Sequence, residues 1–169
     1  MQIEAYLAEG VISGSVATTS AFRDALEAAQ PIDVDQATWY PMNGGPAEER
    51  PRIRLEQDDL LVICDESEDL PIHASWHPVE LDIGPFHLSG DLPTLPGYDP
   101  GRALSRPGGP FVLLREVRLD VLGHPEGGSV ERPHAFVNRY AVERFAADIE
   151  LGFYFPGAHF LTPAGRTPS

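Results

Sequence analysis

The residues best suited to bind a metal ion are two histidines near the middle of the chain. His73 and His77 are four residues apart, Cys64 precedes them, and an acidic run occupies residues 65–69. On a helix, this spacing would place both imidazoles on one face, where they could bind a divalent metal. Prolines on both sides of the pair disfavour a helix, and the acidic run lacks the glycine and spaced ligands of an EF-hand loop. The sequence therefore predicts no metal site and keeps a metal-dependent enzyme around His73 and His77 as an alternative.

Two arginines could bind an anion. Arg102 and Arg106 form an R-x-x-x-R pattern, and paired guanidinium groups can hold phosphate oxygens in bidentate fashion. The pattern resembles the cyclic-dinucleotide-binding loop of PilZ-like barrels, although the [DN]-x-S-x-x-G motif of those domains does not follow Arg106. Together with Arg139, these residues define a second alternative, a sensor of a small anionic ligand or cyclic nucleotide.

The sequence contains no pattern for an activated nucleophile or a resident cofactor. Neither Ser13-Gly14 nor Ser89-Gly90 lies in a G-x-S-x-G motif, and no G-x-G-x-x-G opens a helix after a strand. The chain has no lysine, which excludes a Schiff-base lysine and a P-loop lysine. We therefore predict no catalytic residue and no cofactor, and the sequence favours a non-enzymatic role.

Charge restricts the kinds of partner. The 169 residues carry a formal net charge of −14, which repels phosphate backbones and anionic membranes and fits a basic protein partner. The amino terminus lacks the basic stretch and apolar run of a signal peptide, and no apolar run approaches the roughly 20 residues that span a bilayer. The single cysteine excludes an internal disulfide. We expect a cytoplasmic protein that binds a protein partner or itself, without nucleic acid and without a membrane span.

The last part of the chain is aromatic and uncharged apart from one arginine. Five large apolar side chains lie within nine residues of it: Phe153, Tyr154, Phe155, Phe160 and Leu161. Aromatic residues are enriched in interface cores because they bury much area at low entropic cost. The segment either docks on a partner or covers an open sheet edge or the seam between two halves of the chain.

Most of the chain consists of a unit that occurs twice. Three short motifs occur twice, in the same order in both copies. They are Ile12-Ser13-Gly14 with Leu88-Ser89-Gly90, Ala25-Leu26 with Ala103-Leu104, and Glu49-Arg50-Pro51 with Glu131-Arg132-Pro133. The offsets of 76, 78 and 82 residues grow where Pro and Gly mark loops, which tolerate insertions. The repetition predicts two pseudo-symmetric subdomains that pack together.

Each copy is predicted to run strand, strand, short helix, strand, strand. In the first copy, apolar spacing and turn residues predict a hairpin over 3–16, a helix over 20–29, a strand over 32–40 and one or two strands over 53–64. In the second copy they predict strands over 79–83 and 86–92, a helix over 99–106 and strands over 111–122, 135–137 and 142–145.

This order of elements resembles the small β-barrel repeats of uncharacterised bacterial domains, and through them the Sm-like or SH3-like barrel. In the first copy, the resemblance rests on Ile12-Ser13-Gly14, Ala25-Leu26 and Leu60-Leu61-Val62. In the second copy it rests on Leu88-Ser89-Gly90, Ala103-Leu104, Phe111-Val112-Leu113-Leu114 and Val137-Asn138-Arg139. An Sm-like barrel implies single-stranded RNA as a ligand, but this acidic chain has no basic-aromatic RNA site.

The sequence thus predicts a mainly β protein of two tandem, pseudo-symmetric small β-barrel-like repeats. The first repeat covers residues 1–64, an acidic and polar linker 65–78, the second repeat 79–151 and the aromatic tail 152–169. The predicted function is that of a non-enzymatic protein-binding or assembly module. It would contact its partner through the aromatic tail or the groove between the repeats.

Overall fold

The fold is mainly β, as predicted, in a computed structural model that describes residues 1–17, 19–66, 74–94, 109–122, 129–148 and 155–160. Residues 1–66 contain β1 (Gln2–Leu7), β2 (Gly10–Ser15), α1 (Thr19–Glu27), β3 (Ile32–Pro41), β4 (Glu48–Leu55), the 3-10 turn η1 (Gln57–Asp59) and β5 (Val62–Asp65). The later residues contain β6 (Ser75–Ile83), β7 (Phe86–Thr94), β8 (Phe111–Val121), β9 (Val130–Asn138), β10 (Val142–Ala147) and β11 (His159–Phe160).

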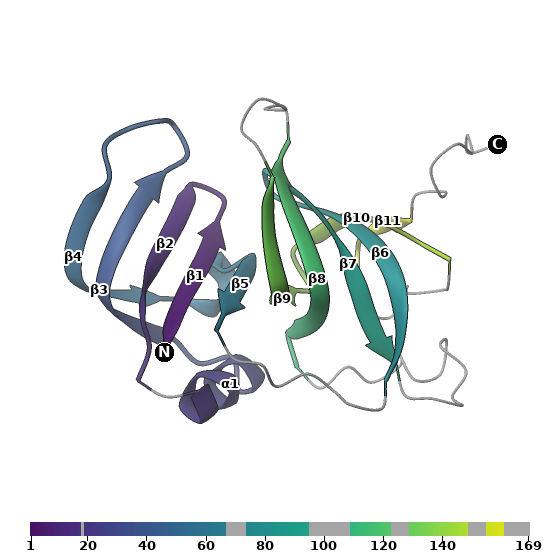
Figure 1. Ribbon diagram of the computed structural model, residues 1–169, viewed down its shortest axis with the longest axis horizontal. Coiled ribbons are helices and arrows are strands. Elements are labelled where there is room, and N and C mark those ends of the chain that lie inside the picture. Colours follow the sequence, from purple (N-terminus) through teal and green to yellow (C-terminus); the bar gives the residue numbers. More distant parts are fainter. Residues whose placement is uncertain (18, 67–73, 95–108, 123–128, 149–154, 161–169) are drawn as a thin grey trace.

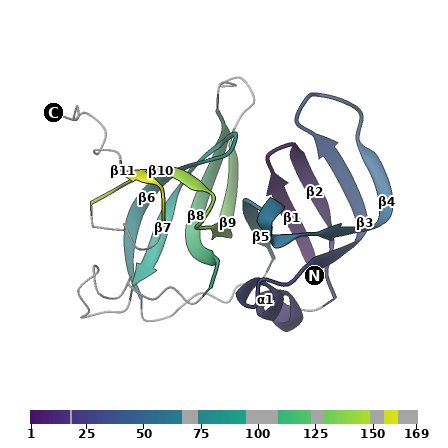
Figure 2. The same cartoon turned by 180° about the vertical axis from the view of Figure 1, so that it is seen from behind.

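All eleven strands belong to one open sheet, with the order β11-β10-β6-β7-β8-β9-β5-β1-β2-β3-β4. Within β1–β5, the fifth strand lies beside the first, and the second, third and fourth follow; the same order holds within β6–β10. Figures 1 and 2 show the two sets of strands as curved lobes side by side, with α1 at one end of the first lobe. We call β1–β5 with α1 the first half, and β6–β10 the second half.

The predicted elements of the first half are present. Its hairpin is β1–β2, and its helix is α1, which buries Phe22 and Leu26 on the predicted face. The helix ends where Ala29 adopts a φ of 54° and the Gln30 N–H donates to the Ala25 carbonyl oxygen, as in many helix C-termini. The helix expected over 99–106, including the motif Ala103-Leu104, lies outside the described residues.

The expectation of closed, barrel-like repeats is not met, because the sheet stays open. Closing the first half would require β4 to pair with β5, but β5 pairs with β9 of the second half instead. In the described part of the chain, β4 has β3 as its one neighbouring strand. A strand has two hydrogen-bonding edges, and β5 uses one for β1 and the other for β9.

Both halves bend at a β-bulge in the same place. The pairing of β2 with β3 shifts between Ser13 and Ser15, and the pairing of β7 with β8 shifts between Ser89 and Asp91. Opposite these shifts, Gln36 and Glu116 adopt left-handed backbone angles with φ of 48° and 50°. Bulges increase strand bending and twist, which curves each half around its own apolar core.

The two cores lie on opposite faces of the sheet where the halves meet. Along β5, Val62 and Cys64 point into the core of the second half, whereas Ile63 points into the core of the first. Along β9, Val137 belongs to the core of the second half and Phe136 packs against the first. Side chains alternate between faces along a strand, so each of these two strands contributes to both cores.

In the part of the chain that the structure describes, no helix combines the length and the apolar character needed to cross a membrane.

The bulges explain why each half carries a glycine in its second strand, and they predict unequal costs for enlarging it. A Cβ at Gly14 would lie 2.5 Å from Val34 Cγ1 and 2.8 Å from the Asp35 carbonyl oxygen, whereas a Cβ at Gly90 would lie 3.1 Å from its nearest atom. We expect Gly14→Ala to lower the free energy of unfolding by about 2–3 kcal/mol and Gly90→Ala by clearly less. Urea denaturation of both variants checks this, and equal losses would contradict it.

Candidate functional site

The seam between the halves combines backbone pairing with side-chain contacts, and the Asn138 N–H donates to the Leu61 carbonyl oxygen beside the paired residues. The strands β5 and β9 share two residue pairs, Val62 with Val137 and Ile63 with Phe136. Beyond these pairs, two side-chain contacts continue the junction, Arg132 with Glu4 and His134 with Asp65. A short ladder between the lobes is therefore extended by an ion pair from β9 to β1 and by a hydrogen bond from β9 to β5.

The first contact is a bidentate ion pair. Arg132 Nε donates to Glu4 Oε1 at 2.7 Å and Arg132 Nη2 donates to Glu4 Oε2 at 3.0 Å. The hydrogen bond with Glu4 raises the pKa of Arg132 further above its ordinary value. The Tyr6 hydroxyl also donates to Glu4 Oε2, at 3.2 Å. Two parallel N–H···O bonds fix both distance and orientation, so this pair sets how β9 lies against β1.

The second contact is buried. His134 Nε2 and Asp65 Oδ1 form a hydrogen bond, and their side chains are 2% and 0% exposed. Asp65 is the last residue of β5 and not part of a solvated acidic segment. A buried charged group is costly unless it is paired, so each member of this pair depends on the other.

Cys64, in strand β5 at the seam, is a buried thiol. Desolvation by burial, with the nearby Glu4 carboxylate, raises its pKa to about 12. Because the thiolate is the reactive form of cysteine, this thiol is unreactive near neutral pH. Burial raises the pKa of Tyr6 in the same way.

Two grooves occupy matching places in the two halves. The seam groove, of about 430 Å³, is lined by Gln2, Ile3, Glu4, Ser13, Cys64, Asp65, Glu66, Arg132, Pro133 and His134. The outer groove, of about 420 Å³, is lined by Pro78, Val79, Glu80, Ser89, Gly90, Asp91, Glu116, Ala146, Ala147 and Asp148.

Strand register shows that the two grooves correspond. In the first half, Glu4 pairs with Ser13 on one side and with Cys64 on the other. In the second half, Glu80 pairs in the same way with Ser89 and Ala146. Glu80 therefore holds the place in the outer groove that Glu4 holds in the seam groove.

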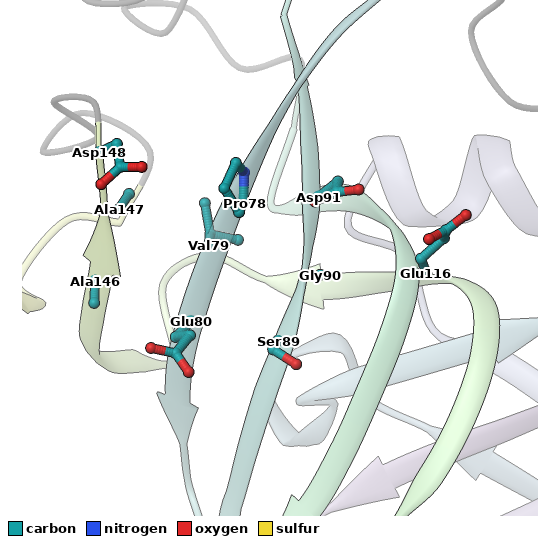
Figure 3. Close-up of a pocket in the computed structure, with 10 residues that line it drawn as sticks. All are labelled: Pro78, Val79, Glu80, Ser89, Gly90, Asp91, Glu116, Ala146, Ala147 and Asp148. Carbon is teal, nitrogen blue, oxygen red and sulfur yellow. The ribbon is translucent and has the colours of Figure 1, made fainter. Parts of the chain in front are cut away.

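The two grooves differ in what lies over β5 and its counterpart β10. In the seam groove, β9 forms part of the lining with Arg132, Pro133 and His134. The described residues that line the outer groove include no basic side chain, and four of them are carboxylates, those of Glu80, Asp91, Glu116 and Asp148. Figure 3 shows Asp148 and Glu80 on the side of β10 and β6, and Asp91 and Glu116 on the opposite side.

Part of the negative charge in the outer groove is left without a close cation. Glu80 lies 3.7 Å from His87 Nε2, and Asp91 lies 3.6 Å from Arg115 Nε. Among the described residues, Glu116 and Asp148 have no ion-pair partner, and both are exposed. The groove therefore favours a cationic ligand.

A third cavity, of about 520 Å³, lies between the halves and is mostly apolar. Its lining includes Tyr6 and Phe86, whose rings meet edge to face with centroids 5.5 Å apart, as well as Tyr40 and Met42. Tyr40 is 48% exposed.

Two members of the predicted aromatic interaction set are described. Phe155 is 1% exposed and packs on Phe145 of β10, and Phe160 in β11 packs on the same ring while remaining 52% exposed. The other members, Phe153, Tyr154 and Leu161, lie outside the described residues. The sequence predicts that this segment either docks on a partner or covers a sheet edge or the seam. Within the segment, β11 pairs with β10 and so covers that edge of the sheet.

The other predicted site residues lie apart from the grooves or outside the described residues. Arg102, Arg106 and His73 are outside them. Arg139 donates through Nε to the Gly109 carbonyl oxygen, and its guanidinium lies 4.4 Å from the Tyr140 ring centroid. His77 lies in strand β6, so no helix supports the four-residue spacing. Among the described residues, no group of three potential metal ligands gathers.

One signal for the grooves is present in the sequence, the repeated Glu49-Arg50-Pro51 and Glu131-Arg132-Pro133. Register places Arg50 opposite Ala37 and Arg132 opposite Val117, at matching positions of β4 and β9. The acidic partner Glu4 is far from Arg132 in sequence, so only the fold brings the two together. Comparison with protein-family models, with curated proteins and with solved structures finds no match for this chain.

The buried pair predicts a large loss of stability when one member is removed. We expect Asp65→Ala to lower the free energy of unfolding by about 3–5 kcal/mol, because it leaves His134 buried without its partner. The exposed pair of Arg118 and Asp120 is the control, and Arg118→Ala should cost less than about 1 kcal/mol. Urea denaturation measures both losses. Equal losses would contradict the large contribution to the free energy of unfolding that we expect of the buried pair.

The buried thiol predicts a loss of stability at alkaline pH. The pKa of Cys64 lies above its ordinary value of 9.0, so between about pH 9 and 12 the native state holds a proton that the unfolded state has released. The free energy of unfolding should therefore fall as pH rises through this range, by roughly 1.4 kcal/mol per unit of difference in pKa at most. Cys64→Ala should flatten the decline in chemical denaturation, leaving the part due to Tyr6. An unchanged slope would contradict this.

Proposed function

We propose that this protein is a binding or assembly module whose outer groove takes a basic, extended segment of a protein. The observation that carries the proposal is the seam groove, where the same framework of strands already holds such a segment, Arg132-Pro133-His134 of β9. The outer groove offers the matching carboxylate, Glu80, with three more acidic residues around it. An extended ligand would lie along the edge of the sheet beside β10.

The match between the halves also supports an origin by duplication, in which each half is one copy of a five-strand unit. The shared strand order, the two bulges and the motif at Arg50 and Arg132 agree with this origin. On this proposal, the ligand preference of one groove indicates that of the other. In the seam groove, β9 of the same chain takes the place of the ligand. The outer groove is the corresponding site for a ligand from another molecule.

Charge supports a basic ligand over other classes. The chain has a net charge of −14, and the outer groove adds four carboxylates in one place. A guanidinium group binds a carboxylate in bidentate fashion, as Arg132 binds Glu4. An arginine-containing strand is therefore favoured over an anionic ligand and over an uncharged one.

The proposal predicts binding of a basic extended peptide, and fluorescence anisotropy can test it. The probe is a labelled decapeptide of alternating arginine and valine, and the matched control probe has glutamate in place of arginine. We expect saturable binding of the arginine peptide and none of the glutamate peptide. The variant Glu80→Gln/Asp148→Asn should weaken binding about tenfold or more, since a charge-assisted contact contributes roughly 1.5–3 kcal/mol.

A control variant separates groove binding from general attraction to an acidic protein. Asp58→Asn/Asp59→Asn removes the same charge from exposed residues of η1 and should leave binding nearly unchanged. If both double variants lose affinity equally, or if the peptide does not bind to the wild-type protein, the proposed function is wrong.

A further inference from the structure

Among the described strands, β4 is the last of the sheet, at the end opposite to β11 and β10. Its sequence, EERPRIRL, begins with two glutamates and continues with three arginines, Arg50, Arg52 and Arg54, separated by Pro51 and Ile53. The arginine side chains are about 60% exposed, at 59%, 63% and 63%. They contact nearby acids such as Glu48, but exposed pairs of this kind contribute little and exchange readily.

The outer edge of β4 corresponds to the edge of β9 that pairs with β5 at the seam. Arg50 corresponds to Arg132 because they pair with Ala37 and Val117 at matching positions of β3 and β8. By the same register, Arg52 corresponds to His134, since their partners are Asp35 and Arg115. The edge strand of the first half thus carries the arginine that, in the second half, binds Glu4.

Resting on the proposed function, we infer that the basic segment bound in the outer groove is the β4 edge of a second copy of this chain. Arg50 of one molecule binds Glu80 of the next, repeating the internal contact of Arg132 with Glu4. Arg52 then lies toward Ala147, the counterpart of Asp65 on β10, and toward the following Asp148. The molecules associate head to tail, because each offers one basic edge and one acidic groove.

Head-to-tail contacts use two different surfaces, so they extend into rings or chains and do not stop at a dimer unless an end is blocked. In this protein β11 blocks part of one end. His159 and Phe160 pair with Arg144 and Phe145, which correspond to Val62 and Ile63, the two residues of β5 that pair with β9. β11 therefore occupies the backbone positions that an incoming β4 would use, and it limits the association.

The contact between molecules is weaker than the seam for a second reason. Arg54 stands where Phe136 stands in β9, so the incoming strand lacks the ring that packs on Phe22. Ala147 stands where Asp65 stands, so no buried pair forms. What remains is mainly electrostatic, and we expect association at micromolar to millimolar protein that falls as salt screens the exposed charges.

Sedimentation-equilibrium measurements on single variants and on their mixture test the inference. We expect Arg50→Glu and Glu80→Arg each to be monomeric alone, and an equimolar mixture to associate, because the wild-type Arg50 of one variant then meets the wild-type Glu80 of the other. A chain ending at Ala158, which lacks β11 and keeps Phe155, should associate at least about tenfold more tightly than the full chain. Glu27→Arg, a change of the same charge as Glu80→Arg at an exposed residue of α1, should associate like the wild type.

Several results would overturn the inference. One is that the chain ending at Ala158 stays monomeric at millimolar concentration. Another is that the mixture of the two variants stays monomeric. A third is that Glu80→Arg associates as the wild type does, because this result would indicate contact between two β4 edges. If the arginine peptide binds in the groove while the chain ending at Ala158 stays monomeric, the self-association is wrong and the proposed function stands. If neither binding is seen, both are wrong.

Discussion

The pairing of β5 with β9 is the contact on which the rest of this structure depends. It is a ladder of two residue pairs, yet it joins two five-strand halves into one sheet and sends side chains of each strand into both cores. Backbone pairing of that length is weak by itself. The buried hydrogen bond of His134 with Asp65 makes the register specific, since a shift of one residue would leave both buried polar side chains without this partner. Arg132 and Glu4 then fix the orientation from the partly exposed side.

Because β5 uses its second edge for β9, the sheet cannot close, and two edges remain to be protected. The two edges of the sheet are protected in different ways. The edge at β4 carries Pro51 and alternating charges, which discourage indiscriminate strand pairing. The edge at β10 is covered over two residues by β11, with Phe155 and Phe160 packed on Phe145. The outer groove begins where that cover stops, at Ala146 to Asp148.

The outer groove and the β4 edge are the two sides of a contact that the molecule already makes once inside itself. That internal example gives the proposed binding its chemistry, an arginine on an extended strand against a carboxylate on β6, without reference to any other protein. A net charge of −14 opposes association between copies at long range, while the local charges attract at short range. The balance makes the proposed assembly responsive to salt and to whatever removes β11 from its edge.

The sequence by itself determined the local elements and the likeness of the two halves. The alternation of apolar residues in the strands, the apolar face at Phe22 and Leu26, and the motif at Arg50 and Arg132 are visible in the chain because they depend on spacing within a few residues or on identity between copies. Which strands pair across the halves depends instead on contacts between residues far apart, such as His134 with Asp65. Only the tertiary structure therefore decided that the sheet stays open, that Asp65 is buried, and that β9 lines one groove with Arg132 while the described lining of its counterpart is acidic.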